Sequence, residues 1–156
     1  MQIDYSLVIP CYNEEGNIKY LFDNLLKLKS FRKLEIILVD NGSNDYTFKT
    51  LTHHKKKNKK LKIKIIRIKK NKGFGFGVYQ GLNKSVGKYL CYTHADRETK
   101  ILDLKKTFKI IDANSNLNFL IKGRRINRAK NHWTLIDQIF SKSCDLVLSI
   151  ILFKQL

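Results

Sequence analysis

The sequence predicts an α/β fold in which helices flank a mostly parallel sheet. Short apolar runs alternate with stretches of helical periodicity along the 156 residues. A helix between successive strands returns the chain to the start of the sheet, so the strands that it joins run parallel. Polar and glycine-rich segments come just after the apolar runs, at the sheet edge where such folds bind their ligands.

Three apolar runs in the first half of the chain predict strands. Residues 5–9 (YSLVI) end at Pro10, and residues 34–39 (LEIILV) end at the turn cluster 40–43. Both runs are continuous, as in strands that are covered on both faces. Residues 62–69 (KIKIIRIK) alternate apolar and basic side chains. We therefore expect a third strand with one wet face, near an edge of the sheet.

Helical periodicity and shorter apolar runs account for most of the remaining chain. Apolar residues at helical spacing, separated by polar ones, predict helices between and after the strands. The expected helices cover residues 14–28, 45–54, 77–85, 101–111 and 133–153, and further short strands are expected at 89–93 and 119–121.

The chain is strongly basic. Lysine and arginine number 31 against 13 aspartate and glutamate residues, which gives a formal net charge of +18. This excess favours an anionic partner such as nucleic acid, an anionic lipid or a phosphorylated ligand. Residues 46–95 contain no acidic side chain, and the densest basic run is 55–60 (KKKNKK).

The basic run has two main interpretations, a solvated surface or a surface that binds an anionic membrane. Proteins that read the bases of nucleic acids often place aromatic residues among the basic ones. No aromatic residue other than histidine lies between His54 and Phe74. We therefore expect an anionic membrane surface or plain solvation, and no specific nucleic acid partner.

The cysteines and the apolar segments indicate where in the cell the protein is expected. Cys11, Cys91 and Cys144 lie far apart and form no C-x-x-C pair, so we expect reduced, buried thiols rather than a zinc site or disulfides. No secretory signal pattern opens the chain, and no stretch reaches the ~20 apolar residues of a membrane span. The expected location is cytoplasmic, peripheral at the inner face of the membrane.

Two segments that follow the first two strands carry polar side chains. Residues 8–15 (VIPCYNEE) lead from a strand into a helix, where Asn13 could cap the helix and the acids favour its start. Residues 38–45 (LVDNGSND) place Asp40 at a strand end. Its carboxylate could accept hydrogen bonds from a base or a ribose, or satisfy the backbone of a turn.

Two later segments suit phosphate and metal chemistry. In residues 71–77 (NKGFGFG), glycines such as Gly73 allow the backbone to approach a diphosphate closely. In residues 92–98 (YTHADRE), His94, Asp96 and Glu98 alternate along an extended segment. Oxygen ligands with one imidazole suit magnesium or manganese that bridges a nucleotide diphosphate.

In their order and spacing, the four segments resemble those of glycosyltransferase family 2, which read VIPxYNE, VDDGSxDxT, NxGxGxA and DxD. The subgroup that looks most similar is the polyprenyl-phosphate sugar transferases, whose GxR segment resembles residues 122–125 (KGRR). The resemblance implies a GT-A nucleotide-sugar-binding fold. It also implies a divalent metal, manganese or magnesium, that holds the diphosphate of a nucleoside diphosphate (NDP) sugar.

The resemblance further implies which residues would bind the base and ribose of the donor. These residues come from the ends of the first two strands and the loops after them: Pro10, Tyr12, Glu14, Val39 and Asp40.

Two catalytic residues also follow from the resemblance. Asp96 would bind the metal, with Ala95 beside it and with His94 and Glu98 as further metal ligands. Arg125 would meet a phosphate of the donor or of the acceptor. A planar guanidinium suits this role because it pairs bidentately with phosphate oxygens.

The sequence departs from the family pattern in three places. Asn41 replaces the second acidic residue of VDDGS. His94 replaces the first acidic residue of DxD, and this softer ligand favours manganese over magnesium. The sequence ends at Leu156. We therefore expect a single domain, residues 1–156, that lacks the C-terminal part of the family.

The expected reaction is inverting transfer of a hexose from a GDP- or UDP-sugar to a polyprenyl phosphate. The acceptor phosphate is already ionised near pH 7, because its second pKa is about 6, and it needs positioning more than a base. The alternative is a catalytically inactive, truncated domain that binds a nucleotide or an anionic lipid. The apolar last helix, residues 146–153 in particular, would pack on the sheet, touch a membrane interface, or bind a partner chain or second copy.

Overall fold

The computed structural model describes residues 3–31, 33–97, 99–114 and 120–123. The chain divides into two units, residues 1–117 and residues 118–156. In the second unit, the described residues 120–123 have no regular structure. The strand expected at 119–121 is therefore wrong at 120 and 121, while residue 119 and the expected helix 133–153 lie outside the described residues.

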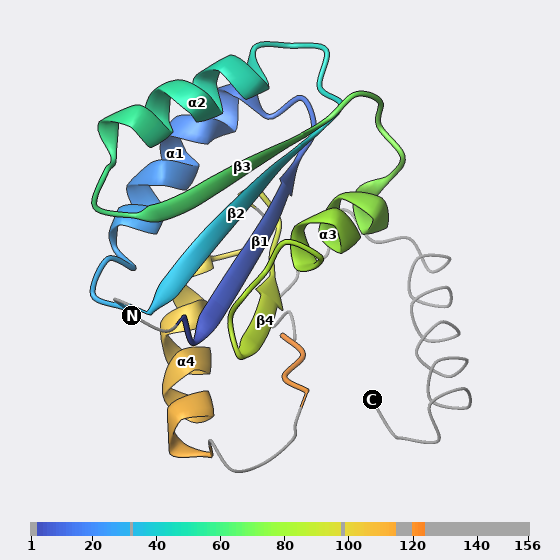
Figure 1. The fold of residues 1–156 in the computed structure, drawn as a ribbon. Helices are drawn as coiled ribbons and strands as arrows, with labels where there is room; N and C mark the ends of the chain where they lie inside the picture. Colours follow the sequence, from blue (N-terminus) through green and yellow to red (C-terminus); the bar gives the residue numbers. More distant parts are fainter. Residues whose placement is uncertain (1–2, 32, 98, 115–119, 124–156) are drawn as a thin grey trace, which may run out of the picture. The chain divides into compact units, whose positions relative to one another are not determined.

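The first unit contains a four-stranded, fully parallel sheet (Figure 1). Its strands are β1 (Tyr5–Cys11), β2 (Leu34–Asn41), β3 (Lys62–Ile68) and β4 (Tyr89–Tyr92). They lie in the order β3-β2-β1-β4. The predicted α/β class and the four strands of this unit are confirmed, and β3 lies at an edge of the sheet as its alternating pattern predicted.

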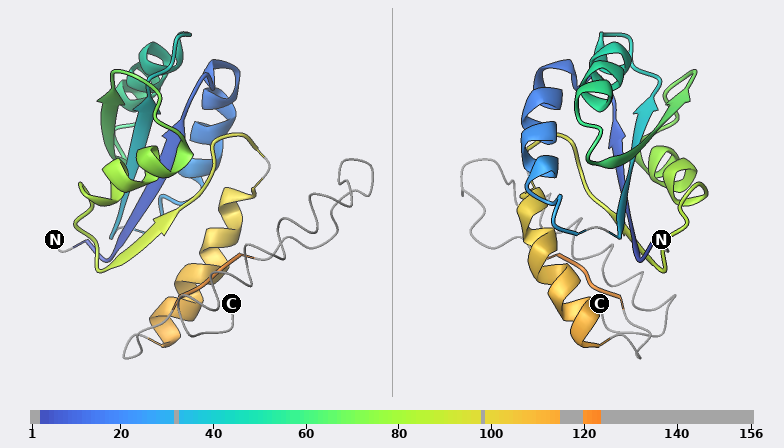
Figure 2. Two further views of the ribbon diagram at one scale, coloured as in Figure 1. Left: turned by 90° about the vertical axis from the view of Figure 1, so that its right-hand side faces the viewer. Right: turned by 60° about the vertical axis from the view of Figure 1, so that its left-hand side comes forward.

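Helices cover both faces of the sheet (Figures 1 and 2). One face packs against α1 (Glu15–Leu26), α2 (Thr47–Lys57) and α4 (Leu104–Ala113), which follows a 3-10 turn at Ile101–Asp103. The other face packs against α3 (Phe74–Leu82). Among the described residues, no helix has the length and apolarity required to cross a membrane.

Two clusters of buried apolar side chains hold these layers together. Alternate residues of β1 and β2 point to opposite faces, as the pleat requires. Toward α1, α2 and α4, the fully buried members include Leu7, Ile9, Leu38, Phe22, Leu51 and Phe108. Toward α3, the smaller cluster contains Val8, Ile37 and Val39, with Leu82 packed against them.

β1 continues through Pro10, although the sequence predicted that the strand ends there. The amide of Thr93 donates to the carbonyl of Val8 at 3.1 Å, so alternate residues of β1, Pro10 included, face the β4 side. Paired β4 stops short of this level. A proline is tolerated because no ladder hydrogen bond is lost there, while Pro10 stays in register with Val39 on the other side.

α3 begins at Phe74, earlier than the expected start at Gly77. Glycines in this segment allow close packing rather than forming only a loop. A Cβ at Gly81 would lie 2.2 Å from Cγ1 of Val8, and one at Gly77 would lie 3.0 Å from Cβ of Pro10. The missing side chains therefore let α3 lie directly on β1.

The two cysteines of the described part of the chain differ in burial. Cys11 is buried and unpaired, and Cys91 is partly buried and unpaired. Burial raises the pKa of both thiols, that of Cys91 to about 11. Cys144 lies outside the described residues.

A buried polar network fixes the connection between α3 and β4 at the amino-terminal edge of the sheet. Oε1 of Glu35 accepts hydrogen bonds from the Ser6 hydroxyl at 2.6 Å and from the Val86 amide at 2.7 Å. Oε2 of Glu35 lies 2.9 Å from Nζ of Lys64. Ser6 Oγ accepts in turn from the Gly87 amide at 2.9 Å. The network stabilises this turn on the edge opposite the loops described below.

Replacing Glu35 by glutamine removes the charge and keeps the shape of the side chain. Burial raises the pKa of Glu35, but the hydrogen bonds from Lys64, Ser6 and Val86 outweigh it, so the pKa lies below the ordinary 4.5. We expect Glu35→Gln to lower the free energy of unfolding by about 1–2 kcal/mol at pH 7. Urea unfolding at a series of pH values measures the change.

The pH dependence of this difference has a defined sign. A folded-state pKa below the unfolded value stabilises the fold above the unfolded-state pKa, and this stabilisation is lost as the pH falls through the folded-state value. The gap between wild type and Glu35→Gln should therefore narrow below about pH 4.5. Asp23→Asn, at an exposed carboxylate of α1, is the matched control. A gap that stays constant with pH would contradict the role of the Glu35 charge.

Candidate functional site

The four strands end at one edge of the sheet, and the segments that follow them contact one another there. Loop 1 (residues 12–14) follows β1, loop 2 (42–46) follows β2, loop 3 (69–73) follows β3 and loop 4 (93–97) follows β4. All the predicted site residues in the described part lie in these loops or in the adjoining ends of β1 and β2.

Loops 1 and 2 are joined by hydrogen bonds through Asn13. Its amide donates to Oγ of Ser43 at 3.1 Å, and its Oδ1 accepts from the Asn44 amide at 2.9 Å. Asn13 has a positive φ of 55°, a conformation that asparagine tolerates better than most residues. The sequence allowed Asn13 to cap α1. That interpretation is wrong, because the Asn13 side chain accepts a hydrogen bond from a backbone amide of loop 2 instead.

The starts of α1 and α2 satisfy each other's free amides. The Asp45 carboxylate accepts from the amide of Glu15 at 3.2 Å and from that of Thr47 at 2.9 Å. Oε2 of Glu15 accepts from the Tyr46 amide at 3.3 Å, and Oγ1 of Thr47 accepts from the Glu14 amide at 2.8 Å. Burial raises the pKa of Asp45, but hydrogen bonds outweigh it and hold the pKa below its ordinary value. The two helix starts are thus locked together.

Asp40 is the buried charge of the site. Its side chain is 0% exposed, and its Oδ1 accepts from the Ser43 amide at 3.1 Å. Oδ2 is buried without a hydrogen-bond partner and lies 3.3 Å from Nε of Arg67. The Arg67 guanidinium lies over the ring of Phe48, 4.3 Å from its centroid. A buried carboxylate oxygen that lacks a hydrogen bond is costly unless a ligand supplies the donor.

Asn41 joins loops 2 and 3. Its side chain is 2% exposed, and its Nδ2 donates to the Gly73 carbonyl at 2.9 Å and to Oδ1 of Asn71 at 3.2 Å. Both acceptors are oxygens, so an amide fits where the carboxylate of the family pattern would repel them. Gly42 follows with a φ of 75°, and a Cβ there would lie 2.4 Å from the Asn71 amide nitrogen. Loop 3 therefore packs directly on the backbone of loop 2.

Loop 4 carries His94 and Asp96 next to the start of α3. Nδ1 of His94 lies 3.7 Å from Oδ2 of Asp96, and both side chains are partly exposed. The His94 ring is stacked on Phe74, with 4.4 Å between centroids and 8° between planes. Ala95 between them is buried.

Arg97 fixes the far end of loop 4 to α1. Its Nη2 donates to the Gly16 carbonyl at 3.0 Å, and its guanidinium lies 4.9 Å from the centroid of the Tyr20 ring. Arg97 has a positive φ of 66°. The contacts join loop 1 to loop 2, loop 2 to loop 3, Phe74 at the start of α3 to loop 4, and loop 4 to α1, so that they form a closed ring at the carboxyl edge of the sheet.

The sequence placed Arg67 only in the general basic run and gave no role to Arg97 or Phe74. One signal in the sequence did point to Arg67, namely its position in the alternating pattern of β3. Lys62 and Lys64 fall on one face of the alternating strand, whereas Arg67 falls on the other face, with the apolar residues. Arg67 therefore lies on the face of the sheet that packs against α2, near Asp40.

The described residues fit a divalent metal only with help from a ligand. In the described ranges, no three histidine, cysteine, aspartate or glutamate side chains lie together as a metal site. His94 and Asp96 are close enough to act as two ligands of one cation. Metals that bind nucleotides characteristically take the remaining ligands from phosphate oxygens and water. Glu98, the third expected ligand, lies outside the described residues.

Comparison with known proteins agrees with this arrangement. Residues 6–154 match the family model described as glycosyl transferase family 2. The chain belongs to this family. Dolichyl-phosphate beta-glucosyltransferase of Dictyostelium discoideum is 33% identical over 113 residues, which cover 68% of this chain and 35% of that protein. The family 2 chain thus spans about a third of the length of that relative.

Solved structures show that the fold is GT-A. A mannosyltransferase from Pyrobaculum calidifontis, solved with GDP-Man and Mn2+, matches with a TM-score of 0.64 and 22% identity. The match covers 71% of this chain and 33% of that one. TarS of S. aureus, solved with UDP-GlcNAc, matches with a TM-score of 0.61 and 26% identity over 72% of this chain and 32% of that one.

The remaining predicted site residues of the family 2 chain differ from one another in burial. Tyr12 is exposed and Glu14 is partly exposed in loop 1. Pro10 and Val39 are buried at the ends of β1 and β2, where the side chain of Val39 packs on the α3 side of the sheet. Arg125 lies outside the described residues.

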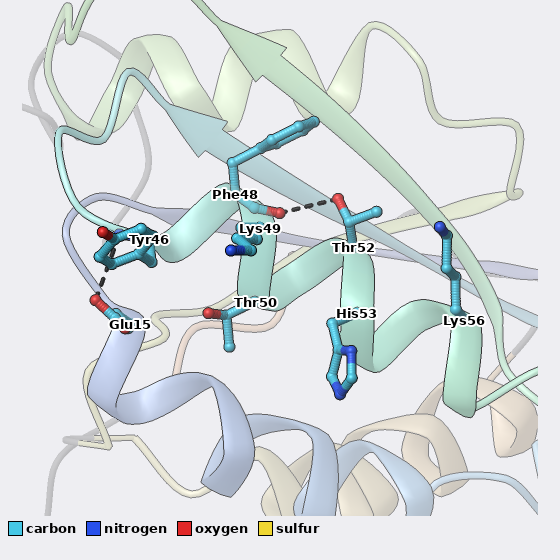
Figure 3. A pocket seen from close by; sticks show the side chains of 8 residues that line it. All are labelled: Glu15, Tyr46, Phe48, Lys49, Thr50, Thr52, His53 and Lys56. Atoms are coloured by element: carbon cyan, nitrogen blue, oxygen red, sulfur yellow. Dashed lines mark hydrogen bonds between the residues drawn. The ribbon is translucent and has the colours of Figure 1, made fainter.

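A hollow of about 700 Å³ lies along α2 (Figure 3). Most of its lining comes from α2, and it meets the locked helix starts at Glu15 and Tyr46. None of the predicted site residues that the structure describes lines it. Its lining is Glu15, Tyr46, Phe48, Lys49, Thr50, Thr52, His53 and Lys56.

Proposed function

We propose that this family 2 chain transfers a hexose from an NDP-sugar to a polyprenyl phosphate, with inversion and with a divalent metal. The observation that carries the proposal is the buried Asp40 carboxylate near the carboxyl end of β2, whose Oδ2 lacks a hydrogen bond. The TarS structure with UDP-GlcNAc and the relative that acts on dolichyl phosphate support the donor and acceptor classes.

In the proposed donor site, Asp40 reads the base. Its Oδ2 would accept an N–H of uracil or guanine, while Arg67 at 3.3 Å balances the charge. Tyr12, Glu14 and the adjoining ends of β1 and β2, at Pro10 and Val39, would surround the base and ribose. Uracil and guanine both present an N–H at their pairing edge, so UDP- and GDP-sugars remain the two candidate donors.

The proposed diphosphate site lies between loops 3 and 4. His94 and Asp96 would hold manganese or magnesium, with Ala95 beside them, and Glu98 would be a further ligand. When bound, the metal would stabilise the negative charge of the departing diphosphate. The backbone at Gly73, which has no side chain to block it, would lie near the phosphates. Arg125 would pair with a phosphate oxygen.

In the proposed reaction, an ionised oxygen of the acceptor phosphate attacks the anomeric carbon of the hexose. The bond from this carbon to the diphosphate oxygen breaks on the opposite side, which inverts the anomeric centre. The electron pair leaves with the nucleoside diphosphate. The acceptor needs no base, because its oxygen is already ionised near pH 7.

We further propose that the protein works on the surface of an anionic membrane, at the cytoplasmic face. The support is a lysine surface that comprises exposed residues of α2, of β3 and of the segments after them. About 1 kcal/mol of attraction per lysine near an anionic bilayer would concentrate the chain beside its lipid acceptor. The lysine surface contains Lys55, Lys56, Lys57, Lys59, Lys60, Lys62, Lys64, Lys69, Lys70 and Lys72.

A binding domain without turnover is the alternative function. The observation that favours it is the small metal-ligand set of the described residues, where His94 and Asp96 form a pair rather than a group of three. The two functions can be distinguished by product formation, since a binding domain would bind nucleotide or anionic lipid and release no product.

Titration calorimetry with UDP-glucose and GDP-mannose, each with manganese and with EDTA, tests the donor site. We expect heat for one donor, dependent on manganese. Asp40→Asn should weaken that binding by about tenfold or more, because it removes a charged hydrogen-bond acceptor. Asp23→Asn is the control for loss of an exposed carboxylate, and circular dichroism checks that both variants fold. No heat from folded wild type with either donor would sink the proposal.

A transfer assay with polyprenyl phosphate in vesicles tests the acceptor and the membrane surface. We expect labelled hexose to enter the lipid, faster in vesicles of anionic lipid than in neutral ones, with the difference falling as salt screens it. Replacing the five lysines of residues 55–60 by glutamine should lower this preference and leave donor binding unchanged. Donor binding without any lipid product would favour the binding-domain alternative. Equal rates in both vesicle types would argue against the lysine surface.

A further inference from the structure

The stacked rings of Phe74 and His94 do not belong to the buried apolar clusters of the core. Phe74, the first residue of α3, is 41% exposed, yet its ring lies flat on the His94 imidazole with centroids 4.4 Å apart and planes 8° apart. The ring of Tyr92 meets Phe74 edge-on at 6.3 Å. An exposed aromatic pair with this geometry fixes orientation more than it adds buried area.

We propose that Phe74 is a positioning residue that sets the plane of the His94 ring for a metal-bound diphosphate, an inference that rests on the proposed function. Nδ1 of His94 faces Asp96 at 3.7 Å. A cation held by both residues would therefore meet the lone pair of Nδ1, and the plane that Phe74 imposes fixes the direction of that lone pair. Rotation of the imidazole out of this plane would break the stack.

The replacement of a carboxylate by an imidazole makes such support useful. A carboxylate offers two oxygens and about four lone-pair directions, so it tolerates rotation of its plane. A neutral imidazole offers a single lone pair, on one nitrogen and in the plane of the ring. His94 stands where the family pattern has an acid, and it therefore has a stricter orientation to keep. Phe74 occupies a variable position of the glycine-rich motif, close enough to supply that support.

The backbone of loop 4 is held by other contacts, so Phe74 acts on the ring. The Thr93 amide donates to the Val8 carbonyl at 3.1 Å, and the hydroxyls of Thr93 and Thr99 lie 3.0 Å apart. Arg97 donates to the Gly16 carbonyl at the other end of the loop. Loss of the Phe74 ring should therefore leave the loop in place and free the imidazole to rotate.

Binding of UDP and of GDP to Phe74 variants, with manganese and with EDTA, tests the proposal by calorimetry. We expect Phe74→Leu to weaken the manganese-dependent binding by about tenfold and to leave the affinity in EDTA unchanged. Phe74→Tyr, which keeps the stack, should restore wild-type affinity. Phe76→Leu is the matched control, since Phe76 belongs to the same motif and its ring lies near Lys72 instead.

A second measurement uses the protein without ligand. In the wild type, the stacked Phe74 ring should shift the NMR signals of the His94 ring protons upfield, and Phe74→Leu should abolish that shift while Phe76→Leu keeps it. Absence of the shift in the wild type overturns the inference, whatever the nucleotide binding. Wild type that binds neither nucleotide in a manganese-dependent way overturns the proposed function and this inference with it. Equal manganese-dependent affinities in wild type and Phe74→Leu overturn the inference alone.

Discussion

The structure of this chain depends on how the carboxyl edge of a parallel sheet satisfies its polar groups. Parallel strands deliver four loops to one edge, where backbone amides and helix starts need partners that the sheet does not supply. Here the loops supply them to each other. Asn13 serves loop 2, Asp45 serves the starts of both α1 and α2, and Asn41 serves loop 3. The stacked rings of Phe74 and His94 and the Arg97 contact complete the ring of contacts between the loops. These contacts hold the four loops in place at this edge.

Two departures from the family pattern have a physical reason in this ring of contacts. At position 41 an amide can donate to two oxygens of loop 3, which a carboxylate cannot do. At position 94 an imidazole replaces an acid and rests on an aromatic ring. Asp40 keeps the charge of the pattern and remains buried with one oxygen unsatisfied beside Arg67. The chain thus retains the acid that we propose binds the base of the donor, and it changes position 94, where we propose that the metal binds.

The sequence predicted the strands well because buried parallel strands have continuous apolar runs, and it placed β3 at an edge from its alternating lysines. It also predicted that the polar loops lie together at one edge, because the carboxyl ends of parallel strands meet there. It could not predict the strand order, which brings β4 beside β1 and so brings Phe74 to His94 from twenty residues away. It misjudged α3, because glycines that allow close packing look the same in sequence as glycines of a loop. The partners of Asn13 and Arg67 depend on contacts across loops, which periodicity does not encode.

We propose that the four loops form one site for a nucleoside diphosphate. Hydrogen–deuterium exchange of the full chain, with and without UDP or GDP and manganese, tests it most directly, because backbone amides in every loop report separately. We expect one nucleotide to slow exchange in residues 12–14, 42–46, 69–74 and 93–97 together, and to leave the turn at residues 83–88 on the opposite edge unchanged. Slower exchange in a single loop, or at the hollow along α2 instead, would contradict a shared site.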